Sequence, residues 1–583
     1  MVGEERILTM NSNILFDYDD FEYYKGKMTS KGTTWVSLGR RPMLDTVYAD
    51  RVSGKLYYSI WCFRADSQKA SITISAEKLA TPAEAVAELA GVGFDVTKET
   101  FMYFQQVVYQ QAEAIQTSTP IHSQLGWYYD TNLEQLGYLA SRSIYKPNIE
   151  RNKSVYFGAY DIGMNPEKPE KDGWKERKEF LKSDILGHDK LECVCLVALS
   201  AATIGLLHNY GKDTLNPIVH LKGDSSQGKT TAAYLGISVA GKPFNGTIEK
   251  NIGNQRKRVS SLFRSWNATE NAISALLAGN EGVPIAFDEL GNFRGNLDNL
   301  TYSMGNGTEK SRANSDSTLC ETSSFHTAIL STGEISIREK IKGQNTGKYI
   351  RFMEIPGPFT ESAEHSRRIK KAAQELYGYE LHLFATYLVN LSKEAVLEKY
   401  EESVREFRDK LPENASLADR IAEGIGGILL TTAYLAEQAL KLPFDKEKLC
   451  KLIIDNVLTE ELTIGRGERS FEKVIEWMDK NIEHFKKIGS GLEAEEPKCK
   501  PAYGTYTIKP SKDNPNSKVV EYVIRPDYLE QALRENNYSL EVLDEWAKKG
   551  YIIPEKGKKL YNRSVIEKNG HREKVYKLQY LSD

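Results

Sequence analysis

The hydrophobic pattern changes along the chain and indicates several structural segments. The first 120 residues combine strand-like runs, rich in β-branched and aromatic residues, with two helical patterns. The strand-like runs fall at 33–39, 45–50 and 55–63, and the helical patterns at 82–89 and 99–115. Ser53–Gly54 separates the last two strand runs and predicts a hairpin turn. We therefore expect an α+β domain over residues 1–120, followed by a β-rich connecting segment at 121–173.

From Trp174 the pattern becomes one of short apolar strands that alternate with glycine-rich turns and helices. The strand candidates are 216–223, 283–289, 325–330 and 348–356. Strand, turn and helix in this order are typical of an α/β fold with a largely parallel sheet. Residues 174–360 are therefore predicted to form an α/β core.

Helical patterns dominate after residue 360 and give way to a small C-terminal unit. They cover 366–391, 393–410, 417–440 and 446–487, which predicts a helical region at 361–488. Prolines, glycines and mixed charge make 489–518 a linker candidate. Residues 519–583 contain two helical patterns, at 527–535 and 540–549, followed by two strand-like runs, at 551–555 and 574–581.

The composition describes an ordinary globular protein. Of the 583 residues, 40% are hydrophobic and 27% are charged, and a formal charge of −3 excludes a generally basic nucleic-acid binder, so any basic surface is local. Six scattered cysteines without a CxxC motif fit reduced thiols rather than a disulfide framework. The apolar run at 193–207 is shorter than the roughly 20 residues that span a bilayer, so we expect a buried helix and a cytoplasmic protein.

The strongest motif follows the first strand of the predicted α/β core. Residues 223–230 fit GxxxxGK[ST], with an apolar strand before them and a helical pattern after them. In such a loop the backbone N–H groups point at phosphates, the lysine contacts the β- and γ-phosphates, and the hydroxyl ligates Mg²⁺. We expect ATP to contact Gly223, Asp224, Ser225, Ser226, Gln227, Gly228, Lys229, Thr230 and Thr231.

A second motif, VPIAFDELG, comes about sixty residues later. A buried strand that ends in two carboxylates suits a magnesium and water site, with Asp288 holding Mg²⁺ and Glu289 polarising the attacking water. Taken alone, such a run would usually be a strand that reaches solvent. The preceding loop with Lys229 favours the catalytic interpretation, and Glu289 favours turnover over a nucleotide-held switch.

Polar side chains on two further strands are candidates for the same site. Ser331–Thr332 ends its strand where a sensor side chain would contact the attacking water or the γ-phosphate. Arg351 lies within an apolar strand, and a buried arginine needs an anionic partner. Glu354 is the local alternative, whereas an arginine finger that reaches a neighbouring subunit's ATP is the catalytic one.

The ordered motifs GDSSQGKTT, WNATENAISALLAG, FDELGN, NGTEKSRA, STGE and GKYIRFMEIP carry a resemblance to a known family. The chain, over roughly residues 30–440, resembles the AAA+ P-loop ATPase core of mobile-element and prophage proteins. That family includes the self-loading, MCM-like replication helicases of staphylococcal pathogenicity islands and chromosomal cassettes. The resemblance implies a homohexameric ring with ATP between subunits and single-stranded DNA in its pore.

The resemblance also assigns roles to individual residues. Arg351 stands at the position of the arginine finger. Arg420 matches the second sensor arginine of the family, and the alternative for Arg420 is an arginine that only contacts solvent on the surface of a helix. Lys310 and Arg312 lie where a pore hairpin would grip DNA. Ser331–Thr332 replaces the asparagine usual at the sensor of MCM proteins, and the cysteine-rich zinc insertion of those proteins is missing.

The C-terminal segment is the candidate for binding origin duplex DNA. Between 555 and 583 there are eight Lys or Arg residues and four Asp or Glu residues, after two helices, as in a winged helix with a basic wing. The DNA-contact candidates are Lys558, Lys559, Arg563 and Arg572. A solubilising tail and a protein-docking domain are the alternatives.

These features together predict an ATP-dependent DNA helicase and replication initiator of a mobile genetic element. Two other functions stay open: an AAA+ ATPase that acts on protein or packages DNA without unwinding it, and a nucleotide-gated DNA-binding regulator.

Overall fold

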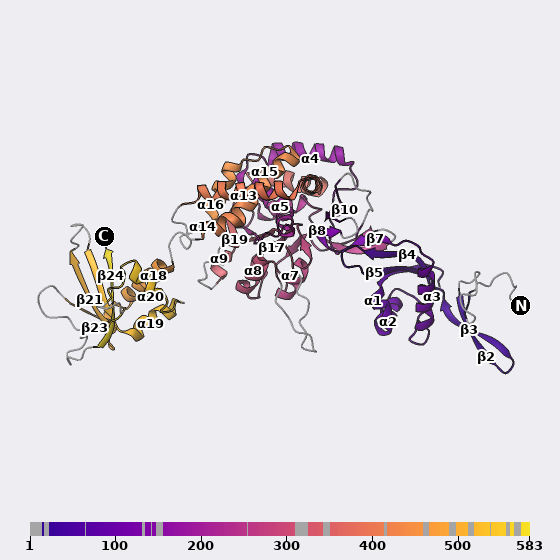
Figure 1. Cartoon of the computed structure of the whole chain (residues 1–583), viewed down its shortest axis with the longest axis horizontal. Helices are drawn as coiled ribbons and strands as arrows, with labels where there is room; N and C mark the ends of the chain where they lie inside the picture. Colours follow the sequence, from indigo (N-terminus) through magenta and orange to yellow (C-terminus); the bar gives the residue numbers. More distant parts are fainter. Residues whose placement is uncertain are drawn as a thin grey trace. The chain divides into compact units, whose positions relative to one another are not determined.

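The computed structural model groups its described residues into two compact units (Figure 1). The first comprises 1–340, 351–410 and 421–453, and the second 341–350, 411–420 and 454–583. The described residues are 14–16, 22–64, 66–130, 134–141, 143–146, 155–252, 255–308, 324–341, 350–412, 417–458, 466–488, 497–510, 518–536, 538–554, 560–564 and 573–582.

The N-terminal part of the first unit has the α+β character expected for it. A five-stranded sheet in the order β11-β7-β4-β5-β6 packs through Ile60, Ile74 and neighbouring apolar residues against the helices. Its strands are β4 (Met43–Asp50), β5 (Leu56–Phe63), β6 (Lys69–Ser75), β7 (Thr119–His122) and β11 (Val155–Tyr156), and the main helices are α2 (Pro82–Gly91) and α3 (Phe101–Glu113). β4 and β5 form the expected hairpin. A separate sheet contains β1 (Ile14–Phe16), β2 (Glu22–Thr29) and β3 (Gly32–Arg40).

The connecting segment joins this part to the α/β core. Its strands β8 (Leu125–Asp130), β9 (Gln135–Leu139) and β10 (Ser143–Ile144) form an antiparallel sheet. β8 also pairs in parallel with β16 (Asn280–Glu281), which belongs to the core. The Trp127 indole N–H donates to the Ala202 carbonyl at 2.6 Å, so the segment is also tied to a core helix.

The core contains the parallel sheet that the strand and helix pattern predicted. Its order is β15-β17-β18-β12-β19, and every neighbouring pair is parallel. The strands are β15 (Phe263–Ser265), β17 (Ile285–Asp288), β18 (Ile329–Gly333), β12 (Ile218–Lys222) and β19 (Phe352–Pro356). Because the strands run the same way, the carboxyl ends of β12, β17 and β18 lie at one edge of the sheet, where ligands bind in open α/β sheets.

The longest apolar helix of the chain lies inside this core. α5 (Asp189–Asn209) is long and apolar enough to cross a membrane, but 94% of its most apolar window is buried in the protein. It packs against α6 (Lys229–Ser238), α15 (Gly427–Leu440) and β18. The expectation of a buried helix over 193–207 is therefore confirmed.

The helical region has the expected helices, with three of the four predicted segments divided. The segment 366–391 is two helices, α11 (Ala363–Glu375) and α12 (Tyr379–Leu388), because Gly378 between them has a φ of 84°. α13 (Lys393–Lys410) matches its prediction, and α14 (Ala418–Ile421) and α15 share the segment 417–440. The segment 446–487 contains α16 (Lys446–Val457) and α18 (Arg466–Lys480).

The second unit has its own core, which extends beyond the expected 519–583. Phe471, Val474 and Trp477 of α18 are buried with Leu529 and Trp546 of the two later helices, α19 (Pro526–Glu535) and α20 (Val542–Lys548). The sheet order is β20-β21-β22-β24-β23. Its strands are β20 (Phe485–Lys487), β21 (Gly504–Pro510), β22 (Lys518–Ile524), β24 (Glu573–Ser582) and β23 (Asn562–Ser564). Part of the segment expected to be a linker is therefore a sheet strand, β21.

Candidate nucleotide-binding site

A glycine-rich loop connects β12 to α6 at the ligand-binding edge of the sheet. Two of its residues, Ser226 (φ 68°) and Gly228 (φ 82°), have left-handed backbone conformations. A Cβ at Gly228 would lie 2.7 Å from the Thr360 hydroxyl oxygen, and one at Gly223 would lie 2.2 Å from Gln227 Oε1. The left-handed backbone at Gly228 therefore favours glycine, whereas a Cβ at Gly223 would require the flexible Gln227 side chain to move. The loop opens directly into the N-terminus of α6.

Lys229 is the first residue of α6, and its side chain folds back under the loop. Its Nζ donates to the carbonyl oxygens of Gly223 at 2.5 Å and Asp224 at 2.8 Å, and it lies 3.9 Å from Glu334 Oε1. The residue is only 7% exposed. The amine therefore lies inside the loop that the sequence assigned to it.

Three oxygen-bearing side chains from three segments meet at the tip of β17. The Thr230 hydroxyl donates to Asp288 Oδ1 at 3.2 Å, and the Thr332 hydroxyl donates to the same oxygen at 2.6 Å. Thr230 lies in α6, Asp288 ends β17 and Thr332 lies near the end of β18. The residues predicted to hold magnesium and to act as a sensor are therefore in direct contact.

Glu289 follows Asp288 in an unusual backbone conformation. Its φ is 63°, and its backbone N–H donates to the Thr332 hydroxyl oxygen at 3.1 Å. A non-glycine residue in this region costs on the order of 1–3 kcal/mol, and such costs are concentrated at functional sites. The carboxylate lines the same pocket as the glycine-rich loop.

The structure separates the two candidate sensor residues, Ser331 and Thr332. Because side chains alternate along a strand, they lie on opposite faces of the sheet. The Ser331 hydroxyl bonds His220 Nδ1 at 2.8 Å and accepts from the Trp266 indole at 3.0 Å, away from Asp288. Burial lowers the pKa of His220 to about 4, so the His220 imidazole that contacts Ser331 is uncharged at neutral pH. Thr332 alone faces the acidic strand tip.

A pocket of about 640 Å³ lies over the glycine-rich loop. Residues 225–231 form one wall with Glu289 and Glu334, and the start of α11 forms another. Arg367 and Lys370, one helical turn apart on α11, line this second wall. The Thr231 and Ser366 hydroxyls are joined by a 2.8 Å hydrogen bond that holds the two walls together.

Sequence reasoning missed this second wall. The signal was present, because Ser362 caps α11 by accepting from the His365 N–H at 3.1 Å, directly after a strand that neighbours β12. Two basic residues three apart on a helix share one face.

Arg351 lies away from the loop of its own chain. It precedes β19, whose Phe352 pairs with Ile218 at the start of β12, so about five residues, roughly 16 Å of strand, separate Arg351 from the loop. Its Nε and Nη2 donate to Asn306 Oδ1 at 3.1 Å and 2.9 Å, and its guanidinium lies 4.5 Å from the Tyr302 ring centroid. Glu354, the expected local partner, instead accepts from the Ser336 hydroxyl and the Ile337 N–H. The finger role stays a prediction.

The remaining predicted contacts stay predictions. Arg420 is exposed on α14. Lys310, Arg312, Lys558, Lys559 and Arg572 lie outside the described residues. The backbone of Arg563 lies in β23, but its side chain is not described.

The fold is a mixed α/β architecture with a helix-turn-helix domain at its C-terminal end. The model of the Cch helix turn helix domain matches residues 466–583, which agrees with the finding that α18 shares the core of the second unit. The chain belongs to the family described as Domain of unknown function (DUF927), which matches residues 21–324.

A solved structure shares the fold over nearly the whole chain. It is titled "SCCmec type IV Cch - active helicase", with a TM-score of 0.68, 22% sequence identity, and coverage of 98% of each chain. No curated protein matches this sequence.

Proposed function

We propose that this protein is an ATP-dependent DNA helicase and replication initiator of a mobile genetic element. In this proposal it is a cytoplasmic AAA+ P-loop ATPase that assembles as a homohexameric ring, passes single-stranded DNA through its pore and binds origin duplex DNA with its C-terminal winged-helix domain.

One observation carries the ATPase part of the proposal. Thr230 and Thr332 both donate to Asp288 Oδ1, beside a glycine-rich loop that contains a buried lysine. The strand of Thr332 lies between the strand that precedes the loop and the strand that ends in Asp288. An extra strand with a polar sensor at this place is what we expect of an AAA+ core.

The donor set fits a magnesium nucleotide. A hydroxyl and a carboxylate oxygen are ligands that Mg²⁺ prefers, and Thr230 and Asp288 would hold the ion. When bound, Mg²⁺ supplies positive charge to the β- and γ-phosphate oxygens. The N–H groups around the loop and the amine of Lys229 would bind these phosphates. Glu289, on the pocket wall, would orient and deprotonate the attacking water.

The DNA part of the proposal rests on the C-terminal unit and on the structural likeness. A helix-turn-helix domain is a common DNA-binding module, and the matched structure is titled an active helicase. Lys310 and Arg312 in the pore, and Lys558, Lys559, Arg563 and Arg572 on the wing, remain the proposed DNA contacts.

The decisive experiment is ATP-driven unwinding of a forked DNA duplex by the wild type, Lys229→Ala and Glu289→Gln. We expect DNA to stimulate ATP hydrolysis in the wild type, and both variants to lose unwinding while they keep their fold. Lys222→Ala is the matched control. Lys222 ends β12, the strand that precedes the glycine-rich loop, and its partly exposed side chain pairs with Glu339 outside the pocket.

The outcomes separate the three functions. ATP turnover without strand separation would favour an AAA+ ATPase that acts on protein or packages DNA. Nucleotide-dependent DNA binding without multiple turnover would identify a regulator, a function that the acidic Glu289 on the pocket wall disfavours.

A further inference from the structure

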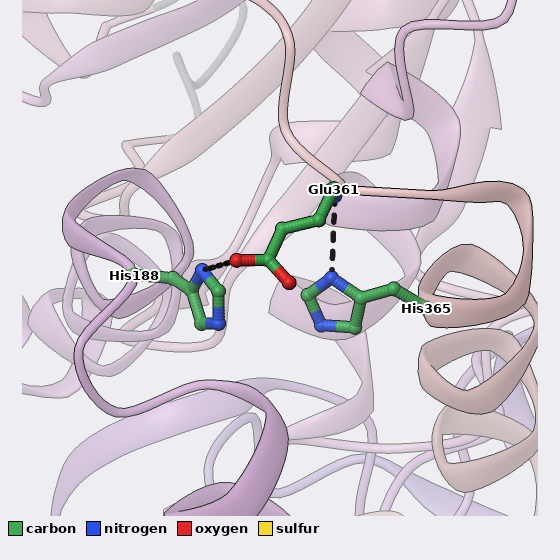
Figure 2. Close-up of side chains that lie close together, drawn as sticks. All are labelled: His188, Glu361 and His365. Atoms are coloured by element: carbon green, nitrogen blue, oxygen red, sulfur yellow. Dashed lines mark hydrogen bonds and ion pairs between the residues drawn. The ribbon is translucent and has the colours of Figure 1, made fainter.

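A cluster of two histidines and a glutamate lies beside the nucleotide pocket. His188 precedes α5 as its N-cap residue, Glu361 follows β19, and His365 lies in the first turn of α11. The ligand atoms of all three lie within 4.8 Å of one another. Figure 2 shows the Glu361 carboxylate between the two imidazole rings. The starts of two helices that are distant in sequence therefore bring metal-binding groups to one point.

The orientation of His365 is that of a metal-binding histidine. This residue is 2% exposed, and its Nε2 lies 2.9 Å from the Asp184 carbonyl oxygen. A carbonyl accepts only, so Nε2 carries the proton and Nδ1 presents its lone pair to the cluster. Metal-binding histidines characteristically donate their other N–H to a carbonyl or carboxylate. The Glu361 N–H contacts Nδ1 at 3.4 Å, which is a long hydrogen bond that a metal ion can replace.

The spacing of the other two groups also suits a metal ion. His188 Nδ1 lies 3.7 Å from Glu361 Oε1. Ligands of a tetrahedral zinc ion, with bonds of about 2.0–2.1 Å, are about 3.3 Å apart, so small side-chain rotations close the site. The Glu361 side chain is 70% exposed and that of His188 is 30% exposed, which leaves a route from solvent.

We propose that His188, Glu361 and His365 bind a divalent transition-metal ion of the zinc class. Two imidazoles and one carboxylate are borderline ligands that favour Zn²⁺, Co²⁺ or Ni²⁺ over Mg²⁺, which prefers oxygen ligands. Three protein ligands leave a fourth position for water. The ion joins the start of α5 to the start of α11, and Glu361 also lines the nucleotide pocket, so the site braces one wall of that pocket.

The chain contains a second cluster of the same composition, which serves as an internal comparison. His208, Glu281 and His326 also place their ligand atoms within 4.8 Å of one another. There, however, His326 Nδ1 bonds Glu281 Oε2 at 2.8 Å, and the two imidazoles stack with centroids 3.3 Å apart. This hydrogen bond is shorter than the 3.4 Å and 3.7 Å contacts of the first cluster, and we assign no metal to the second cluster.

The test is metal binding by the full-length protein, measured without nucleotide. Protein treated with EDTA is titrated with Co²⁺, followed by visible absorption, and with Zn²⁺ in competition with a chromophoric chelator. The variants are His188→Ala and Glu361→Gln, which change exposed or partly exposed side chains and preserve the buried His365. Glu364→Gln is the matched control, because Glu364 is exposed on the same helix and lies outside the cluster.

The proposal expects one Zn²⁺ bound by the wild type and by Glu364→Gln, with no displacement by excess Mg²⁺. In His188→Ala and Glu361→Gln the Zn²⁺ affinity falls by about 10- to 100-fold, and the visible absorption of bound Co²⁺ is lost. Zn²⁺ also raises the thermal unfolding midpoint of the wild type but not of Glu361→Gln. Unchanged Zn²⁺ affinity in both cluster variants would overturn the proposal. None of these readouts depends on ATP hydrolysis, so a failure here is distinct from a failure of the proposed function.

Discussion

The Thr332 hydroxyl donates a 2.6 Å hydrogen bond to Asp288 Oδ1 and accepts the Glu289 N–H at 3.1 Å. One side chain therefore fixes both carboxylate-bearing residues at the tip of β17. A single threonine can make both contacts, since a hydroxyl both donates and accepts.

Removal of this hydroxyl should reduce turnover more than nucleotide binding. In Thr332→Val the shape of the side chain is kept, but Asp288 and the Glu289 N–H each lose a partner. We expect kcat for ATP hydrolysis to fall about 10- to 100-fold, with nucleotide affinity changed by less than a few-fold. Thr332→Ser keeps the hydroxyl and should recover most of the rate. Equal activity of the valine and serine variants in a steady-state ATPase assay would contradict the assigned contact.

The second wall of the pocket gives a prediction about nucleotide binding. Arg367 and Lys370 line the pocket from α11. Arg367→Gln and Lys370→Gln should each weaken binding of a fluorescent ATP analogue by about 10-fold, because each removes a positive charge near the proposed phosphate position. Lys371→Gln is the matched control, because Lys371 is exposed on the same helix and is not among the pocket-lining residues. Unchanged affinity of both the Arg367 and Lys370 variants would contradict a role for this wall in nucleotide binding.

The sequence predicted the core of this site because its motifs are local. The loop at 223–230 and the pair Asp288–Glu289 each follow a recognisable apolar strand, and parallel strands bring their carboxyl ends together. The choice between Ser331 and Thr332 was also implicit in strand alternation, although only the structure shows which face meets Asp288.

Other parts of the site depend on contacts that are distant in sequence. The hydrogen bond between Thr231 and Ser366 spans 135 residues, and no local pattern indicates it. Glu354, three residues away, was one of the two partners considered for Arg351, but the guanidinium bonds Asn306, 45 residues earlier. The C-terminal core likewise includes α18, because its apolar face packs against later helices, whereas its sequence reads as a continuation of the helical region.

The role of Arg351 can be tested by mixing two inactive proteins. An arginine that acts on a neighbouring subunit's ATP is needed in trans, whereas Lys229 is needed in the subunit that binds the nucleotide. Mixed rings of Arg351→Ala and Lys229→Ala would contain some interfaces with both residues intact. We expect each variant alone to be at least about 100-fold slower than the wild type and the mixture to regain measurable ATPase activity.

Two results would instead support a structural role for Arg351. Its guanidinium packs on Tyr302 and bonds Asn306, so a purely structural arginine would, when replaced, lower the thermal unfolding midpoint. No recovery on mixing, together with a lowered midpoint of the Arg351→Ala protein, would identify this local packing as its function. Arg351→Lys keeps the positive charge but lacks the planar guanidinium with its several N–H donors. Comparison of the Lys and Ala variants therefore shows whether the charge alone is sufficient.

The buried His220 gives a prediction about acid stability. Burial lowers its pKa to about 4, below the value of about 6.5 expected in the unfolded chain, so the unfolded chain binds more protons between these pH values. The stabilisation is therefore fully present above pH 6.5 and is lost as the pH falls toward 4, at up to about 1.4 kcal/mol per pH unit. His122, whose pKa burial also lowers to about 4, adds a loss of the same sign. Denaturant unfolding between pH 7 and pH 5 should show His220→Asn with a shallower pH dependence than the wild type. Identical slopes would mean that His220 binds the same number of protons in the folded and unfolded chains, and would contradict its lowered pKa.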